Sequence, residues 1–319
     1  MQVRSIRTPG ESLQKSIVSG SFAQGDVQSS WRISRLNASP SRPFYRRKDM
    51  PYIRANGIKI AYDTFGDMTK PPLFLVHGLT SNRLVMFDMA QSLADDRFVI
   101  VYDCRGHGQS DKPTSYTLAD HGHDLLALID LFGYDKADLC GISMGSYVVG
   151  QAAVFDDSRV DHLILALAKG YDDGTGSSVA GVLKAKGLTM AEVSQEEMIA
   201  LITDAVWAPT TSQKRRDEFM AQQVEVMSHP YAVVLTPEQT AAVNKALVGF
   251  DLRPGLKGVF CPTLVISARY DGLNPVKFGQ EIADLVSNSK LVIMENSGHM
   301  AFFEEGDKFL AVIKDFLAS

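Results

Sequence analysis

Short apolar runs alternate with amphipathic helical segments along most of the chain, and this alternation constrains its fold more than any other feature. Strands that are apolar throughout and separated by helices are typical of a mostly parallel sheet covered by helices on both faces. The sequence therefore predicts an α/β fold with a twisted, mostly parallel sheet. The expected buried strands are 73–76, 98–102, 137–140, 163–168, 264–267 and 291–294. The expected helices are 83–93, 117–132, 145–155 and 308–317.

Local signals support several of these boundaries. Asn56-Gly57 separates the strand-like runs 52–55 and 59–65, and this dipeptide is typical of a two-residue hairpin turn. Thr117, with Asp120 three residues later, has the pattern of a capping box at a helix start. Gly133 is placed to end that helix.

The strand rhythm stops between residues 170 and 260. Patterns typical of helices occupy 196–207, 212–227 and 237–250, and the last begins with a capping box and a first-turn proline. We expect residues 171–258 to form a helical lid inserted in an α/β core. That core would comprise residues 51–170 and 259–319.

The first 50 residues differ from the rest in charge. They carry seven arginines and two lysines against three acids, a net charge of +6, whereas the remaining residues carry −11. Ten serines and no sustained apolar periodicity predict that this segment is mostly disordered. Three interpretations stay open: a solvated tail, an upstream extension of a protein that functionally starts at Met50, and an organelle-targeting segment.

Composition argues against several other functions. The net charge of −5 gives no general reason to expect nucleic-acid binding. Cys104, Cys140 and Cys261 have neither disulfide nor zinc spacing, so we expect buried thiols in a reducing compartment. No apolar run approaches the roughly 20 residues that span a bilayer, and no secretory segment stands near the start. These features predict a cytoplasmic protein that has no membrane segment and needs no metal or organic cofactor. Targeting to an organelle by the first 50 residues stays open.

The strongest chemical signal is Gly141-Ile142-Ser143-Met144-Gly145, which follows an expected strand and precedes an expected helix. A G-x-S-x-G sequence in that context is typical of a nucleophile elbow, whose glycines permit a sharp turn that exposes the serine hydroxyl. The helix N-terminus favours developing negative charge. We expect Ser143 to be a nucleophile and the Met144 N–H to be one oxyanion donor.

The partners of Ser143 should also follow strands, because ligands bind at the carboxyl ends of strands in such sheets. His77-Gly78-Leu79 follows the early strand 73–76, so we expect the Leu79 N–H to be the second oxyanion donor and His77 to hold its loop. His299 follows the last strand and is the expected general base.

Asp271 is the expected acid that orients His299. It follows the strand 264–267, and the chain order Ser, Asp, His fits the elbow pattern. Asp172 or Asp173, after the preceding strand, is the alternative. Apolar residues of the lid are candidates for a substrate pocket, although any one of them can equally pack the lid on the core: Val206, Trp207, Met220, Met227 and Phe250.

Together these motifs resemble the α/β-hydrolase fold family, from about Tyr52 to the C-terminus. The segment 103–110 is itself similar to the family's D-x-R-G-H-G-x-S turn. The stretch 116–145 looks like 3-oxoadipate enol-lactonases, with two departures. Ser146 stands where those enzymes usually have glycine, and His77-Gly78 replaces their Ser-leading loop. A serine at position 143 argues against haloalkane dehalogenases and epoxide hydrolases, which have aspartate there.

The resemblance implies a serine hydrolase that cleaves carboxylic esters or lactones through an acyl-enzyme, acting on a small molecule. The same triad also supports carbon–carbon bond hydrolysis of diketones and, with peroxide, perhydrolysis. A third interpretation is a non-catalytic small-molecule receptor on the same fold. The sequence does not indicate the oligomeric state.

Overall fold

A computed structural model describes residues 51–174, 178–189 and 191–319. The expectations for residues 1–50 lie outside the described residues. The strands are β1 (Tyr52–Ala55), β2 (Ile58–Phe65), β3 (Pro72–Val76), β4 (Phe98–Tyr102), β5 (Ala137–Ile142), β6 (Val160–Ala166), β7 (Thr263–Ala268) and β8 (Ser289–Met294). The helices of the core are η1 (Arg83–Met86), α2 (Phe87–Leu93), α3 (Leu118–Leu131), α4 (Met144–Phe155), η2 (Asp157–Arg159), α9 (Arg253–Leu256), α10 (Val276–Leu285), α11 (Ala301–Glu304) and α12 (Gly306–Leu317).

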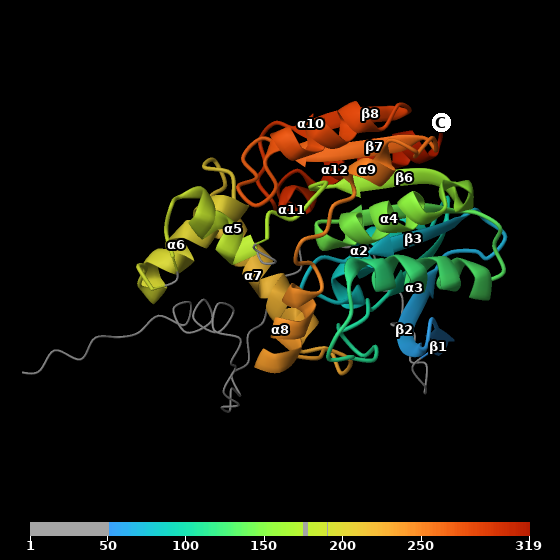
Figure 1. Cartoon of the computed structure of the whole chain (residues 1–319), viewed down its shortest axis with the longest axis horizontal. Coiled ribbons are helices and arrows are strands. Elements are labelled where there is room, and N and C mark those ends of the chain that lie inside the picture. Colours follow the sequence, from blue (N-terminus) through green and yellow to red (C-terminus); the bar gives the residue numbers. More distant parts are fainter. Residues whose placement is uncertain (1–50, 175–177, 190) are drawn as a thin grey trace, which may run out of the picture.

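The strands form one eight-stranded sheet in the order β1-β2-β4-β3-β5-β6-β7-β8. β1 and β2 pair antiparallel to their neighbours, and every pair from β4 to β8 is parallel. The carboxyl ends of β3, β5, β6, β7 and β8 therefore meet at one edge of the sheet. This confirms the predicted α/β architecture, with helices on both faces of a twisted sheet (Figure 1).

Two hydrophobic layers hold the helices against the sheet. On one face, apolar side chains of α3, α4 and α10 pack on the strands, Leu125 and Val148 among them. On the other face, α2 and α12 do the same through side chains such as Leu93 and Phe309. All three cysteines are free and buried, as the sequence predicts. None of the described helices has the length and hydropathy of a membrane span.

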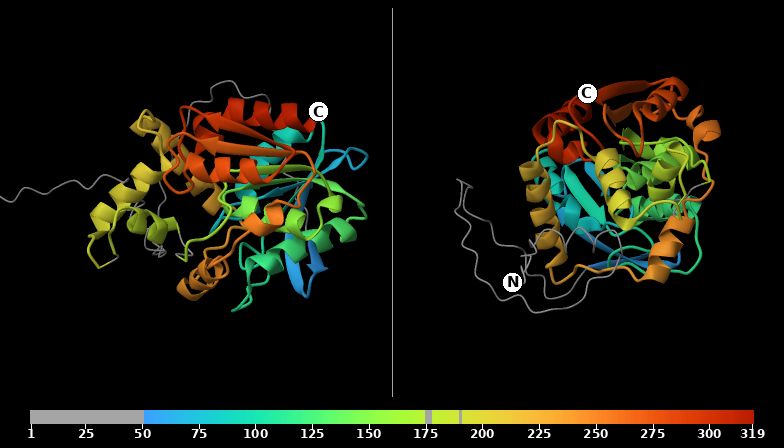
Figure 2. Two further views of the ribbon diagram at one scale, coloured as in Figure 1. Left: turned by 45° about the horizontal axis from the view of Figure 1, so that its top comes forward. Right: turned by 90° about the vertical axis from the view of Figure 1, so that its left-hand side faces the viewer.

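Between β6 and β7 the chain forms a group of helices beyond the carboxyl edge of the sheet (Figure 1 and Figure 2). These helices are α5 (Ser178–Ala185), α6 (Gln195–Val206), α7 (Gln213–Met227) and α8 (Pro237–Lys245). Their two flanking segments run side by side, because Asp172 N–H donates to the Phe250 carbonyl and Leu252 N–H to the Gly170 carbonyl. The helical insert thus starts and ends at neighbouring points of the core.

Two helix predictions differ from the structure, and two helices were not predicted. The 83–93 segment begins with a 3₁₀ turn, η1, capped by the Asn82 side chain, which accepts the Leu84 N–H, and only then continues as α2. The 237–250 helix ends at Lys245, and turns lead from there to Gly249 at φ 72°. Helices α5 and α9 were not predicted, and α9 is too short, at four residues, to show a periodic pattern.

The Asp103 carboxylate fixes the turn after β4. It accepts hydrogen bonds from the Arg83 N–H at 2.8 Å and the Gln109 N–H at 2.7 Å, and it pairs with the Arg83 guanidinium. Both side chains of this ion pair are fully buried, and Arg83 also contacts Asp63 at 2.7 Å. The turn at 103–110 is therefore anchored to η1 at Arg83, its first residue, which directly follows the loop after β3.

Replacing Asp103 by alanine tests this anchor. The change leaves the Arg83 cation buried without its main partner, so the free energy of unfolding should fall by about 3–5 kcal/mol. Asp130→Ala removes an exposed carboxylate that pairs with the half-buried Arg159, and it should cost no more than about 1 kcal/mol. Urea denaturation of both variants gives the comparison, and equal losses would contradict the anchoring role.

Candidate functional site

Ser143 occupies a strained turn between β5 and α4. Its backbone lies at φ 55° and ψ −119°, outside the helical and strand regions. A side-chain carbon at Gly141 would come within 2.1 Å of the Gly145 carbonyl oxygen, and one at Gly145 within 2.1 Å of the Val76 carbonyl oxygen. Only glycine fits at either place, so the G-x-S-x-G spacing is required by close backbone packing. The turn leaves Ser143 half-buried while its neighbours Ile142 and Met144 are buried.

Three side chains meet at this turn in one hydrogen-bonded chain. The Ser143 Oγ–H donates to His299 Nε2 at 3.0 Å. The His299 Nδ1–H donates to Asp271 Oδ2 at 2.8 Å. The other carboxylate oxygen, Oδ1, accepts the N–H groups of Leu273 at 2.9 Å and Asn274 at 2.8 Å. Asp271 is thereby fixed in orientation, and the imidazole is held with Nε2 as the acceptor.

The loop after β3 passes against the nucleophile. A side-chain carbon at Gly78 would lie 3.7 Å from Ser143 Cβ, so Leu79 directly follows a point of contact with the serine. Met144 is the first residue of α4, where backbone N–H groups have no partner inside the helix. The N–H groups expected to be oxyanion donors, those of Leu79 and Met144, thus belong to the two segments that flank Ser143.

His77 holds this loop in place. Its Nε2 accepts the Cys104 N–H at 3.0 Å, and its Nδ1–H donates to the Gly78 carbonyl at 2.8 Å. Complete burial lowers the pKa of His77 to about 4, so the ring is neutral near pH 7. Both ring nitrogens are engaged, which leaves none to accept a proton from Ser143.

Backbone strain is concentrated at the carboxyl edge of the sheet. Among the described residues, four other than glycine have positive φ, and three of these follow β3, β5 and β6: Thr80 at 57°, Ser143 at 55° and Leu167 at 53°. Such conformations cost on the order of 1–3 kcal/mol each and are commonest at functional sites. The elbow is additionally stabilised by the Ser146 hydroxyl, which donates to the Ser143 carbonyl at 2.5 Å. This bond gives a role to the serine that departs from the enol-lactonase pattern.

Glu304, in α11, ties the base loop to the helical insert. Its Oε2 accepts the Gly298 N–H at 2.7 Å, and its Oε1 accepts the Ala208 N–H at 2.9 Å. The Thr211 hydroxyl also donates to Oε1. Sequence reasoning missed Glu304, although a carboxylate five residues after the expected base was a visible signal.

The end of α6 lies against both the acid and the base loops. The Gly272 N–H donates to the Ala205 carbonyl at 2.8 Å, and the Met300 N–H donates to the Val206 carbonyl at 3.3 Å. Each donor comes directly after a member of the hydrogen-bonded chain. The helical insert is therefore fixed to the site at this end.

The expected pocket residues lie in different surroundings. Trp207 is buried against Phe219 and Phe303, as a packing residue would be. Met227 is 37% exposed and Met220 is half-buried, both on α7. Phe250 packs on the ring of Tyr147, with centroids 4.9 Å apart. Phe250 is thus the expected pocket residue with a contact on α4, and Val206 borders the base loop through its backbone.

The alternative acids have other partners. Asp172 accepts the N–H groups of Gly174 and Gly249, each at 2.9 Å, and pairs with Lys169 at 3.3 Å. Asp172 thereby links the start of the helical insert to its end. Asp173 pairs with Lys184 at 3.0 Å at the surface.

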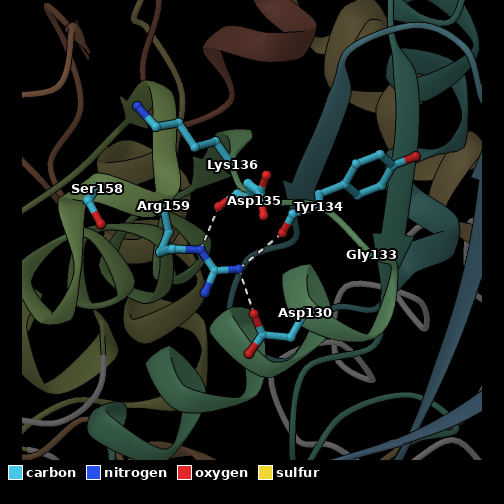
Figure 3. Close-up of a pocket in the computed structure, with 7 residues that line it drawn as sticks. All are labelled: Asp130, Gly133, Tyr134, Asp135, Lys136, Ser158 and Arg159. Carbon is cyan, nitrogen blue, oxygen red and sulfur yellow. Dashed lines mark hydrogen bonds and ion pairs between the residues drawn. The ribbon is translucent and has the colours of Figure 1, made fainter.

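A hollow at the opposite edge of the sheet offers no comparable chemistry. It lies where α3 ends and β5 begins, and Arg159 points into it (Figure 3). That guanidinium already donates to Asp130 Oδ1 at 2.5 Å and to the carbonyls of Asp135 and Tyr134. In the part of the chain that the structure describes, no group of three or more His, Cys, Asp or Glu side chains is arranged to hold a metal ion.

Comparison with known proteins finds relatives that are named as a lactonase and an esterase. The chain is 29% identical over 270 residues to 3-oxoadipate enol-lactonase 2 of Acinetobacter baylyi, which covers 84% of this chain and 95% of that protein. It is 28% identical over 256 residues to the pimeloyl-[acyl-carrier protein] methyl ester esterase of Vibrio parahaemolyticus, covering 77% of this chain and 94% of the relative.

Among solved structures, the enol-lactonase of Burkholderia xenovorans LB400 is similar with a TM-score of 0.71 and 25% identity, covering 84% of this chain and all of that one. The family model of the alpha/beta hydrolase fold matches residues 71–306, a range that includes Ser143, Asp271 and His299. The chain therefore belongs to the α/β-hydrolase fold family.

Proposed function

We propose that this protein is a serine hydrolase that cleaves carboxylic esters or lactones by acyl transfer to Ser143. The observation that supports this most is the hydrogen-bonded chain from Ser143 through His299 to Asp271, built on a strained turn at a helix N-terminus. Such a chain activates a hydroxyl that is otherwise a weak nucleophile. Two relatives, named as an enol-lactonase and a methyl ester esterase, favour the same bond type.

In the first step, Ser143 Oγ forms a bond to the carbonyl carbon while its proton passes to His299 Nε2. The carbonyl π electrons move to the oxygen, which the N–H groups of Leu79 and Met144 would bind. When the tetrahedral intermediate collapses, the bond between the carbonyl carbon and the alcohol oxygen breaks. His299 gives its proton to that alkoxide, which leaves as the alcohol or, in a lactone, stays attached to the acyl chain.

In the second step, water attacks the acyl-enzyme and His299 takes a proton from it. The bond between the acyl carbon and Ser143 Oγ breaks, the proton returns to Oγ, and the acid is released. Asp271 keeps the Nδ1 proton in place and stabilises the positive imidazole that forms twice in the cycle. Each proton that His299 takes is returned within the same step, so the cycle needs no further reactant.

The helical insert at 171–258 is proposed as the lid over this site. Hydrogen bonds from the acid and base loops to Ala205 and Val206, together with Glu304, fix one end of the segment 195–211. The lid would then supply apolar contacts to the substrate from its other helices, with Phe250 at the wall next to α4.

Labelling with a fluorophosphonate tests the nucleophile. Peptide mass spectrometry of the wild type should find one adduct, on the peptide that carries Ser143, and Ser143→Ala should carry none. Product analysis with esters, lactones and diketones then separates acyl-oxygen cleavage from carbon–carbon cleavage. A folded wild type that admits the probe but forms no adduct would contradict the proposal and favour a binding protein.

Replacing Asp271 by asparagine tests the acid. An amide can donate to His299 Nδ1 and so favours the tautomer whose Nε2 carries the proton and cannot accept one from Ser143. The kcat for ester hydrolysis should fall on the order of 10⁴-fold. Asp173→Asn, which changes a surface ion pair, should leave kcat near the wild-type value. If instead Asp172→Asn abolishes turnover and Asp271→Asn does not, the acid has been assigned wrongly.

A further inference from the structure

Tyr147 is a buried residue near the start of α4. It stands four residues after Ser143, and helical side chains lean toward the N-terminus over the preceding turn. Its side chain is buried at 6% exposure, with the ring on Phe250. Tyr147 therefore lies one helical turn from Ser143, on the same side of α4.

Asn274 orients the phenol from the opposite side. Its Nδ2 donates one hydrogen to Tyr147 Oη at 2.8 Å and the other to the Leu167 carbonyl at 2.6 Å. Its backbone N–H donates to Asp271 Oδ1 at 2.8 Å. Leu167 has the positive φ noted above, and this strained residue accepts one of the two amide hydrogens. One side chain thus connects the phenol with both the strand end of β6 and the acid loop.

The direction of these bonds assigns the phenol proton. Both hydrogens of Asn274 Nδ2 are used, so Tyr147 Oη accepts from it and must donate its own hydrogen elsewhere. The Ser143 Oγ, which gives its own hydrogen to His299, has a free lone pair for that donation. Burial raises the pKa of Tyr147, so the phenol stays protonated.

We propose that Tyr147 is a further catalytic residue, whose Oη–H, oriented by Asn274, donates a hydrogen bond to Ser143 Oγ. Because negative charge develops on Oγ as His299 removes its proton, this donor stabilises the transition state of acylation. The same charge returns to Oγ when the acyl bond breaks, so deacylation gains as well. No proton leaves the phenol in either step. The inference rests on the proposed function of Ser143.

Tyr147→Phe removes the donor and keeps the ring on Phe250. The second-order rate constant for fluorophosphonate labelling of Ser143 should fall about tenfold or more, since the lost bond is to an atom that becomes charged. The decrease should be the same at every pH, because the base is unchanged. Tyr102→Phe also removes a buried phenol hydroxyl, from β4, where its electrostatic neighbours are Cys104 and Asp124. That control should label at the wild-type rate.

Asn274→Leu tests the orienting role in a double-mutant cycle. Alone it should slow labelling, and combined with Tyr147→Phe it should add nothing, because both act through one hydroxyl. Circular dichroism confirms that each variant is folded at the assay temperature. If the wild type is labelled and Tyr147→Phe is labelled at the same rate, this inference is overturned and the proposed function stays intact. Additive effects would overturn the role of Asn274. No labelling of the wild type would overturn the proposed function, and the inference with it.

Discussion

The close approach of three backbone segments at the β5–α4 turn is the constraint on which the rest of the site depends. Gly141 and Gly145 allow α4 to start against the carbonyl of Val76, at the end of β3. The price is a serine in a conformation that costs about 1–3 kcal/mol, held by its N–H bond to the Ala166 carbonyl and by Ser146. In return the hydroxyl stands at a helix N-terminus, where negative charge is favoured.

Hydrogen bonds join the loops around this turn to one another, so their positions do not depend on a bound substrate. His77 joins the loop after β3 to the turn after β4, and Asp103 joins that turn to η1. Asn274 joins the acid loop to β6, and Glu304 joins the base loop to the helical insert. A hydrolase needs such rigidity, because hydrogen-bond donors stabilise a transition state best when they are already in place.

Most of the fold and the three central residues of the site could be predicted from the sequence. Alternating apolar strands and amphipathic helices set the sheet, and the order of the loops after strands brought Ser143, Asp271 and His299 to one edge. What escaped prediction depends on tertiary contacts. Asn274 and Tyr147 lie 127 positions apart in the chain, and nothing local indicates that they share a hydrogen bond. Hydropathy alone does not distinguish Trp207, packed on Phe303, from a residue that faces a substrate.

The central claim is that acyl transfer passes through a covalent bond to Ser143. Rapid-quench mass spectrometry during hydrolysis of p-nitrophenyl acetate tests it most directly, with p-nitrophenol release followed in parallel. The account predicts a burst of about one p-nitrophenol per active chain, on the same time course as acetylation of the peptide that contains Ser143. Steady hydrolysis without a burst would also result from rapid deacylation. Repeating the experiment with an ester whose acyl group is released slowly from the enzyme separates the two explanations. Turnover of such a substrate with no acylated Ser143 at any time would contradict the account.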